Sequence, residues 1–557
     1  MKLKLIALLI SAGLAQQALA QTIVPPPAGA ARLPVKENPE SAKGIAGEPA
    51  KPDPASYGLD PATGVYKHPA ETPSIGGTHP FKGSLDHLDQ SSYLHNTKVE
   101  ALHPEMLGSP YHSWQTTVDM NGRRYMVIHE KSFYKVFDIT DPRKAQLIAQ
   151  KKWGWGSSEH PFGPLTIQFN EKLGKHVAVQ CYEVTRFGIL ENKYKPEQQD
   201  KIDTIRKQPI LRGFRVFELD GPDPATWKKL SELPLDANSS ADKFPQQGSG
   251  CGDIPVYWGG KYLFVSGAPD DSFSNQEYAN FLYNQAQMAF DLSDPRAPKR
   301  LSTWWVPGSR AGEEEEYRKN PRVGKKTAWM GARMPLFIPK DPEKGGKYGY
   351  AAMGGMGFHV IDVSNPAQLK RVGKLDMPVS QAGTEGDNID VSKVEKSGVV
   401  YYSGYPLNED CYEPYKDIYA IDVKNPASPK VIATLPRPTP PKGAAFTDYC
   451  QRRGSFGPKR TGYWHQPGTP SDQYLVYAFY NAGAQIFDVS NPAAPKIAGY
   501  FVPPTVDPKI NQHFGDQTHG VFIEWDRKLI WVFTNHGGYA ISSPLLGAPV
   551  FDLPAKK

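Results

Sequence analysis

The stretch Ile486-Phe-Asp-Val-Ser-Asn-Pro-Ala-Ala-Pro495 decides the architecture of this 557-residue chain, because it recurs four more times with little change. In each copy, apolar residues that favour strands precede an acidic residue. The acidic residue is followed by a turn in which Asn or Asp stands directly before Pro. The other copies are Val136–Pro142, Ala289–Pro298, Val360–Pro366 and Ala420–Pro429, and an imperfect one is Val216–Pro224. Each copy therefore predicts one strand followed by one turn.

The acidic residues of the copies mark units of 60 to 80 residues. They are Asp138, Glu218, Asp291, Asp362, Asp422 and Asp488. These units are longer than the roughly 40–45 residues of a compact propeller blade, so each must carry an insertion. Two more strand-like runs precede the repeat, as in residues 114–120 and 124–128 around the turn Asn121-Gly122. Such sheets gain stability by packing on one another, which predicts an all-β propeller.

This repeat resembles the LVIVD repeat, whose blades carry a (Leu/Val)-(Ile/Val)-(Val/Ile)-Asp-(Val/Ile)-Ser-(Asn/Asp)-Pro core. The resemblance covers roughly residues 110 to 550 and implies a scaffold without implying a reaction. Because the same Asp occupies the same turn five times, we expect it to be structural, whereas an active site needs each group once.

We predict a propeller of seven blades with an extended N-terminal arm. The inner strands are expected to begin near His112, His160, Cys251, Trp329, Glu385, His465 and His519. The seventh unit lacks the Asp signature, and either residues 548–551 or the N-terminal segment could supply its outer strand and close the ring. Six or eight blades also fit the pattern, since the second unit carries a long insertion at residues 186–212.

Three parts of the chain differ in composition. Residues 1–20 combine a basic start, an apolar core and an Ala18-Leu-Ala20 cleavage site, which is typical of a secretory signal peptide. Residues 21–78 are rich in Pro, Ala and Gly and predict an arm or linker, and residues 79–557 form the predicted propeller. No other run reaches the ~18 apolar residues of a membrane span, so we expect a periplasmic or secreted protein.

The net charge bears on nucleic-acid binding, and the cysteine content bears on disulfides. Loss of Lys2 and Lys4 with the signal peptide lowers the formal charge from +6 to +4, which over so long a chain does not indicate nucleic-acid binding. Four cysteines in an exported chain predict two disulfides. Cys411 and Cys450 flank one insertion and are the expected pair, which leaves Cys181 with Cys251, although the sequence allows three pairings.

Chemistry is expected at one rim of the central channel. In a propeller the start of each first strand and the end of each second strand meet at the same rim. The histidines at such positions are His112, His129, His160, His465, His519 and His536. The carboxylates placed there, to which we assign catalytic roles, are Glu130, Asp253, Glu385 and Asp387.

Imidazoles that converge with carboxylates suit a divalent transition metal such as copper, zinc, iron or manganese. The same residues could instead cap backbone groups and join neighbouring blades.

Two classes of function follow. The first is an exported metal-dependent enzyme with redox, lyase or hydrolytic activity on a small substrate. The second, which the resemblance to LVIVD-repeat proteins implies, is a non-catalytic scaffold that binds protein or polysaccharide.

Overall fold

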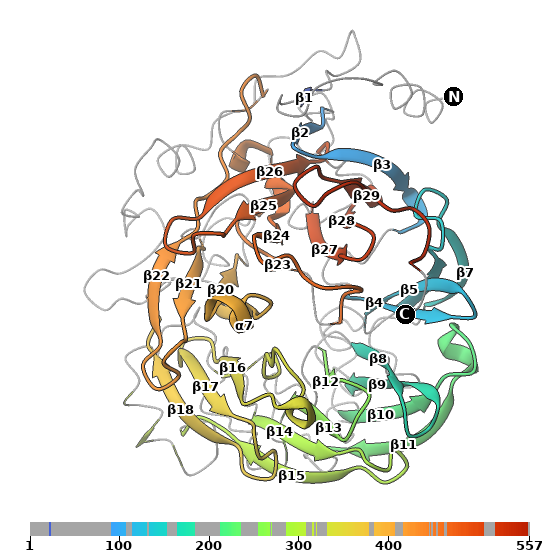
Figure 1. Cartoon of the computed structure of the whole chain (residues 1–557), viewed down its shortest axis with the longest axis vertical. Coiled ribbons are helices and arrows are strands. Elements are labelled where there is room, and N and C mark those ends of the chain that lie inside the picture. The colour runs from blue at the N-terminus through green and yellow to red at the C-terminus, as the bar shows by residue number, and fades with distance from the viewer. Residues whose placement is uncertain are drawn as a thin grey trace, which may run out of the picture.

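Seven antiparallel sheets surround a central axis in the computed structural model of this chain, as Figure 1 shows. This arrangement confirms the predicted seven-bladed, all-β propeller. The structure describes residues 22–23, 91–106, 114–130, 133–152, 164–183, 212–235, 254–267, 286–307, 334–377, 384–406, 416–444, 455–461, 465–505 and 518–554, and the short stretches 269, 313, 315–316, 319, 331–332, 446 and 449–452.

The first three blades each have four described strands, which run in order from the channel outward. Blade one is β4 (Trp114–Met120), β5 (Arg123–Glu130), β6 (Phe133–Asp138) and β7 (Gln146–Lys152). Blade two is β8 (Leu165–Asn170), β9 (Lys175–Glu183), β10 (Arg212–Glu218) and β11 (Lys228–Pro234). Blade three is β12 (Val256–Tyr257), β13 (Tyr262–Gly267), β14 (Ala286–Asp291) and β15 (Lys299–Trp304).

Blades four and five continue the ring. Blade four is β16 (Tyr348–Ala352), β17 (Phe358–Asp362) and β18 (Lys370–Leu375), with Phe337 bridged to Tyr350 on the channel side. Blade five is β19 (Thr384–Asp390), β20 (Val399–Tyr405), β21 (Ile418–Asp422) and β22 (Lys430–Thr434).

The last two blades both take strands from the N-terminal segment. Blade six is β23 (Arg460–Thr461), β24 (Tyr474–Ala478), β25 (Ala484–Asp488) and β26 (Lys496–Val502), extended by β2 (Tyr93–His95) and β1 (Thr22–Ile23). Blade seven is β27 (Thr518–Glu524), β28 (Leu529–Thr534) and β29 (Gly537–Ser542), with β3 (Lys98–His103) outermost. Of the two sources proposed for this outer strand, the N-terminal segment is the right one, and it closes the ring (Figure 1).

The helical elements whose bounds are described are short turns. These are η2 (Pro104–Met106), η4 (Pro224–Thr226), η7 (Pro342–Lys344), α7 (Val394–Ser397), η8 (Tyr449–Arg452) and η9 (Tyr480–Ala482). Residues 315–316 are also helical. In the part of the chain that the structure describes, no helix has the length and apolar character needed to span a membrane.

The repeat Asp has the structural role expected of it. In all five good copies one carboxylate oxygen accepts a hydrogen bond from the backbone N–H two residues later, at 2.8–2.9 Å. The side chain therefore fixes the turn after the third strand of the blade, as Asx turns do. The Asn or Asp before the Pro makes a second such bond, for example from Ala493 N–H to Asn491.

The same turn also joins neighbouring blades. The hydroxyls of Ser231 and Ser302, on two outer strands, each donate at 2.7 Å to the repeat Pro carbonyl of the next blade. His103 on β3 makes the equivalent contact with the Pro142 carbonyl across the closure of the ring, at 2.8 Å. On the outer strand β18 the residue that faces the next blade's Pro carbonyl is a glycine, Gly373. A Cβ at this position would lie only 2.0 Å from the Pro426 oxygen, so a larger residue would not fit. The repeat thus encodes the packing between blades as well as a strand.

A buried ion network joins the last blade to the first. Arg124 of blade one donates to Glu524 at 2.7 Å and to Asp526 at 2.8 Å, both on blade seven. Glu524 also accepts from Trp531 Nε1 at 2.7 Å and lies 3.4 Å from Arg527. Glu524 and Arg527 are both fully buried, so these charges are satisfied by one another and not by water.

One cysteine is described with its bonding state. Cys181, buried on β9, is disulfide-bonded. The side chains of Cys251, Cys411 and Cys450 lie outside the described residues, so the pairings expected from the sequence stay predictions. The same holds for the signal peptide at residues 1–20 and for all of the 21–78 arm except β1.

Candidate functional site

Three of the predicted rim histidines lie at one end of the channel. His129 is next to the end of β5 and pairs with Trp114 at the start of β4, on which its ring stacks at 6.2 Å. His519 is the second residue of β27 in the adjacent blade, and His536 follows β28 of that blade. These three residues therefore share one end of the channel, and their role as metal ligands stays a prediction.

The described charges that act on His519 do not favour a metal cation, although a neutral imidazole is the form that binds one. Burial lowers the pKa of both His129 and His519 to about 3, so both rings are neutral at pH 7. The described charges that act on His519 are those of Arg460 and Lys459, which lower its pKa further. His536 Nε2 already lies 3.3 Å from the carbonyl oxygens of Pro504 and Thr505.

The prediction for His465 is wrong. The inner strand of blade six is β23, at Arg460–Thr461, so His465 comes after this strand and not at its start. It lies at the opposite end of the channel, where its ring makes an edge contact with Trp258 of blade three at 5.8 Å. The error arose because β23 has only two residues and none of the alternation that marks the other strands.

The remaining predicted residues lie outside the described side chains. They are His112, His160 and Asp253, together with Glu130 on β5 and Glu385 and Asp387 on β19, whose backbones alone are described. Among the residues that the structure does describe, no group of three or more His, Cys, Asp or Glu side chains is arranged to hold a metal ion. The metal centre and the catalytic roles assigned to these residues stay predictions.

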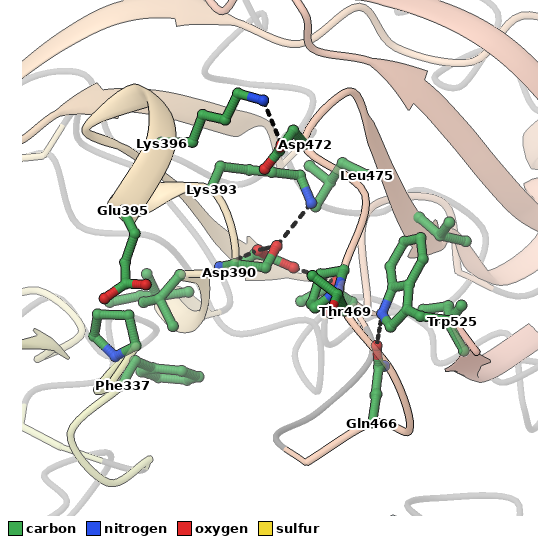
Figure 2. Close-up of a pocket in the computed structure, with 18 of the residues that line it drawn as sticks. Phe337, Asp390, Lys393, Glu395, Lys396, Gln466, Thr469, Asp472, Leu475 and Trp525 are labelled. Carbon is green, nitrogen blue, oxygen red and sulfur yellow. Dashed lines mark hydrogen bonds and ion pairs between the residues drawn. The ribbon is translucent and has the colours of Figure 1, made fainter. Parts of the chain in front are cut away.

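A cavity of about 380 Å³ occupies the opposite end of the channel, and Figure 2 shows it. Its walls come from the ends of the inner strands β19, β23 and β27 and from the loops that follow β12, β19 and β23. Trp258, Phe337, Tyr474 and Trp525 supply aromatic surface, and this volume is in the range of small-molecule sites.

A chain of polar groups forms the floor of the cavity. Lys393 Nζ donates to Ser392 Oγ at 2.8 Å, and Ser392 Oγ donates in turn to the Asp390 carboxylate. The other Asp390 oxygen accepts from Thr461 Oγ1 of blade six at 2.8 Å. Lys393 is only 2% exposed, and burial lowers its pKa, while the charges of Asp390 and Asp472 oppose that shift.

Several buried polar atoms around the cavity have no hydrogen-bond partner among the described residues. Both amide atoms of Asn388, a 1% exposed residue, are in this state. So are His465 Nε2 and Gln466 Nε2, although Gln466 Oε1 accepts from Trp525 Nε1 at 2.7 Å. Burial lowers the pKa of His465 to about 4, so its ring is neutral at pH 7. Unpaired buried polar groups are costly, which makes this end of the channel a candidate site for a ligand.

The mouth of the cavity carries charges of both signs. Lys396 forms an ion pair with Asp472, and the side chain of Glu395, on the same helical turn, points away from this pair toward the side of Phe337 (Figure 2). With Lys393, Lys396, Asp390, Glu395 and Asp472 ionised, the five charged residues give a formal charge of −1. The net charge of the cavity therefore disfavours an anion.

Sequence reasoning missed this cavity, although one signal marks it. Ile389-Asp-Val-Ser392 repeats the strand-and-turn pattern of the blades, and Ser392 N–H binds Asp390 as in the repeats, at 2.8 Å. Here the pattern lies on an inner strand, and Lys393 stands where the repeats have Asn or Asp. In the sequence, the cavity is thus marked only by a copy of the repeat pattern on an inner strand instead of a third strand.

Comparison with known proteins supports the scaffold. Residues 345–376 and 471–502, which include β16–β18 and β24–β26, match the LVIVD repeat. No curated protein matches the sequence. Similar solved structures include the crystal structure of the Myceliophteria thermophila Cps50 (Swd1) β-propeller domain, with 10% identity, coverage of 80% of this chain and 98% of that chain, and a TM-score of 0.39. The chain contains LVIVD repeats and folds as a seven-bladed β-propeller.

Proposed function

We propose that this protein is a binding scaffold that takes a small, neutral, hydroxyl-rich molecule in the cavity at the end of the channel opposite His129 and His519. The observation that carries this proposal is the set of unpartnered buried atoms around the cavity, with both amide atoms of Asn388 foremost. A ligand that pairs with these atoms removes a desolvation cost that the protein alone bears.

The unpartnered polar atoms around the cavity fit ligand hydroxyl groups better than other chemical groups. The oxygen of Asn388 needs a donor, whereas its nitrogen and that of Gln466 need acceptors. A hydroxyl is both donor and acceptor, so a sugar or sugar alcohol can serve all of them. The indoles of Trp258 and Trp525 offer apolar surface to C–H groups, and the formal charge of −1 disfavours an anion.

This proposal is preferred over the metal-dependent enzyme expected from the sequence. That function required at least three imidazoles around one metal ion, and among the described residues no group of three or more His, Cys, Asp or Glu side chains is arranged to hold one. His465, one of the expected ligands, lies at the other end of the channel. The described charges that act on His519 are cationic, which opposes the binding of a metal cation.

The test is a calorimetric titration of the wild-type protein with D-glucose and with sorbitol. We expect both probes to bind, and we expect Trp258→Ala to weaken binding by tenfold or more, about 1.4 kcal/mol, through loss of an aromatic wall. Trp304→Ala is the matched control, since Trp304 is also a half-buried indole of blade three, packs against the same core cluster and does not line the cavity. Failure of both probes to bind, or equal weakening by the two variants, contradicts the proposal.

A further inference from the structure

Lys393 is an unusual residue for the place it occupies. It is almost fully buried at the cavity, and among the described residues no carboxylate lies within ion-pair distance of its Nζ. Its one described hydrogen bond goes to a hydroxyl, Ser392 Oγ, and its Nζ lies 5.7 Å from the Trp525 ring centroid. Lys396, one helical turn away, is exposed and paired with Asp472 in the usual manner of a surface lysine.

We propose that Lys393 is a nucleophilic amine that captures the carbonyl group of a small hydroxy-aldehyde or hydroxy-ketone in this cavity as an imine. The proposal rests on the proposed function, because it names the chemical class of ligand that the same cavity takes. Among hydroxyl-rich molecules it selects those with a free carbonyl, such as the open-chain form of a reducing sugar.

The polar chain beneath Lys393 supplies the proton steps. The ammonium passes a proton to Ser392 Oγ while Ser392 passes its own to Asp390, which leaves a neutral amine and a protonated carboxyl. The nitrogen lone pair then forms a C–N bond to the carbonyl carbon, and the carbonyl oxygen takes up the proton released from nitrogen. Asp390 returns its proton through Ser392 to the resulting hydroxyl, and the C–O bond breaks to release water and leave a protonated imine.

Burial of the Lys393 side chain favours its neutral amine, which is the nucleophilic form. It disfavours the ammonium form and lowers the pKa of Lys393, although Asp390 and Asp472 act in the opposite direction. Each unit by which a lysine pKa falls gives about tenfold more neutral amine at a given pH. Thr461 donates to the far oxygen of Asp390, so the carboxylate is held in place for the exchange.

The experiment is reductive trapping with D-glyceraldehyde and sodium cyanoborohydride near pH 7, followed by peptide mass spectrometry. We expect Lys393 to be alkylated severalfold faster than Lys396, which serves as an internal control. Ser392→Ala should slow labelling of Lys393 by severalfold, because the proton path is lost while the amine remains. Equal rates at Lys393 and Lys396, or an unchanged rate in Ser392→Ala, overturn the inference.

A parallel titration with sorbitol, which has no carbonyl, separates this inference from the proposed function. In the wild-type protein sorbitol should bind, because its binding needs the cavity but not the imine. Sorbitol binding without preferential labelling of Lys393 rejects the imine and leaves the binding cavity intact. Preferential labelling without sorbitol binding supports the amine and rejects the general hydroxyl site.

Discussion

Replacing Glu524 by Gln should lower the free energy of unfolding by about 3–5 kcal/mol, the range expected when one partner of a buried ion pair is removed. Glu524 is fully buried and receives Arg124 at 2.7 Å, and it lies 3.4 Å from Arg527, which is equally buried. The amide leaves these two guanidinium groups without that negative charge. Arg124 keeps Asp119 and Asp526, but Arg527 has only the Ile139 carbonyl within hydrogen-bond distance among the described residues, at 3.1 Å.

This network lies where the last blade meets the first, so its loss should weaken the closure of the ring. Arg124 belongs to the first blade and Glu524 to the last, so their contact holds the seam that closes the propeller. Urea unfolding at pH 7 measures the effect. Asp220→Asn is the matched control, since it removes the charge of an exposed pair with Lys175 and should cost no more than about 1 kcal/mol. A loss below about 1 kcal/mol in Glu524→Gln contradicts the role of the network.

Mild acid should destabilise the protein strongly, and His359 gives the clearest contribution. The residue is fully buried on β17, its Nε2 lies 3.0 Å from the Met356 carbonyl oxygen, and burial lowers its pKa to about 3 while that bond opposes the shift. In the unfolded chain a histidine titrates near about 6.5. Between these values the unfolded state binds a proton that the folded state does not, so stability falls as the pH falls.

The expected slope from His359 is about 1.4 kcal/mol for each pH unit below 6.5, or about 2 kcal/mol between pH 6.5 and pH 5. Urea unfolding at pH 7.5 and pH 5.0 measures it. His359→Gln, which cannot titrate, should reduce the difference between the two pH values by about that amount. If the variant keeps the full pH dependence of the wild type, the imidazole is not held neutral in the folded protein.

The fold could be predicted from the sequence because its determinants are local and repeated. Each copy of the repeat carries its own strand, its own Asx turn at residues such as Asp362 and Asp488, and a Pro carbonyl that meets the next blade. The predicted inner-strand starts near His112 and His519 lie within two residues of β4 and β27. The starts predicted near His160, Cys251 and Trp329 precede the observed inner strands by five to eight residues. The start predicted at His465 follows its strand instead, because β23 has only two residues, both polar.

The cavity could not be predicted in the same way, because its residues meet only in three dimensions. Lys396 and Asp472 are 76 residues apart, and Asp390 and Thr461 are 71 apart. The loops that carry Lys393 and Gln466 share no pattern with one another. The histidines at strand ends pointed to the rim instead, where His129 and His519 are neutral and the described charges that act on His519 are cationic.

The most direct test of the binding cavity is one variant with two readouts, Asn388→Leu. Leucine has nearly the shape of asparagine, and both amide atoms of Asn388 lack a partner among the described residues. The change should therefore raise the free energy of unfolding of the ligand-free protein by about 1–3 kcal/mol, the cost of an unpaired buried polar group. It should also weaken D-glucose and sorbitol binding by tenfold or more, since the same atoms would pair with ligand hydroxyls. A less stable protein that binds both probes as the wild type does would show that Asn388 serves the fold, and would contradict the assignment of the cavity as the ligand site.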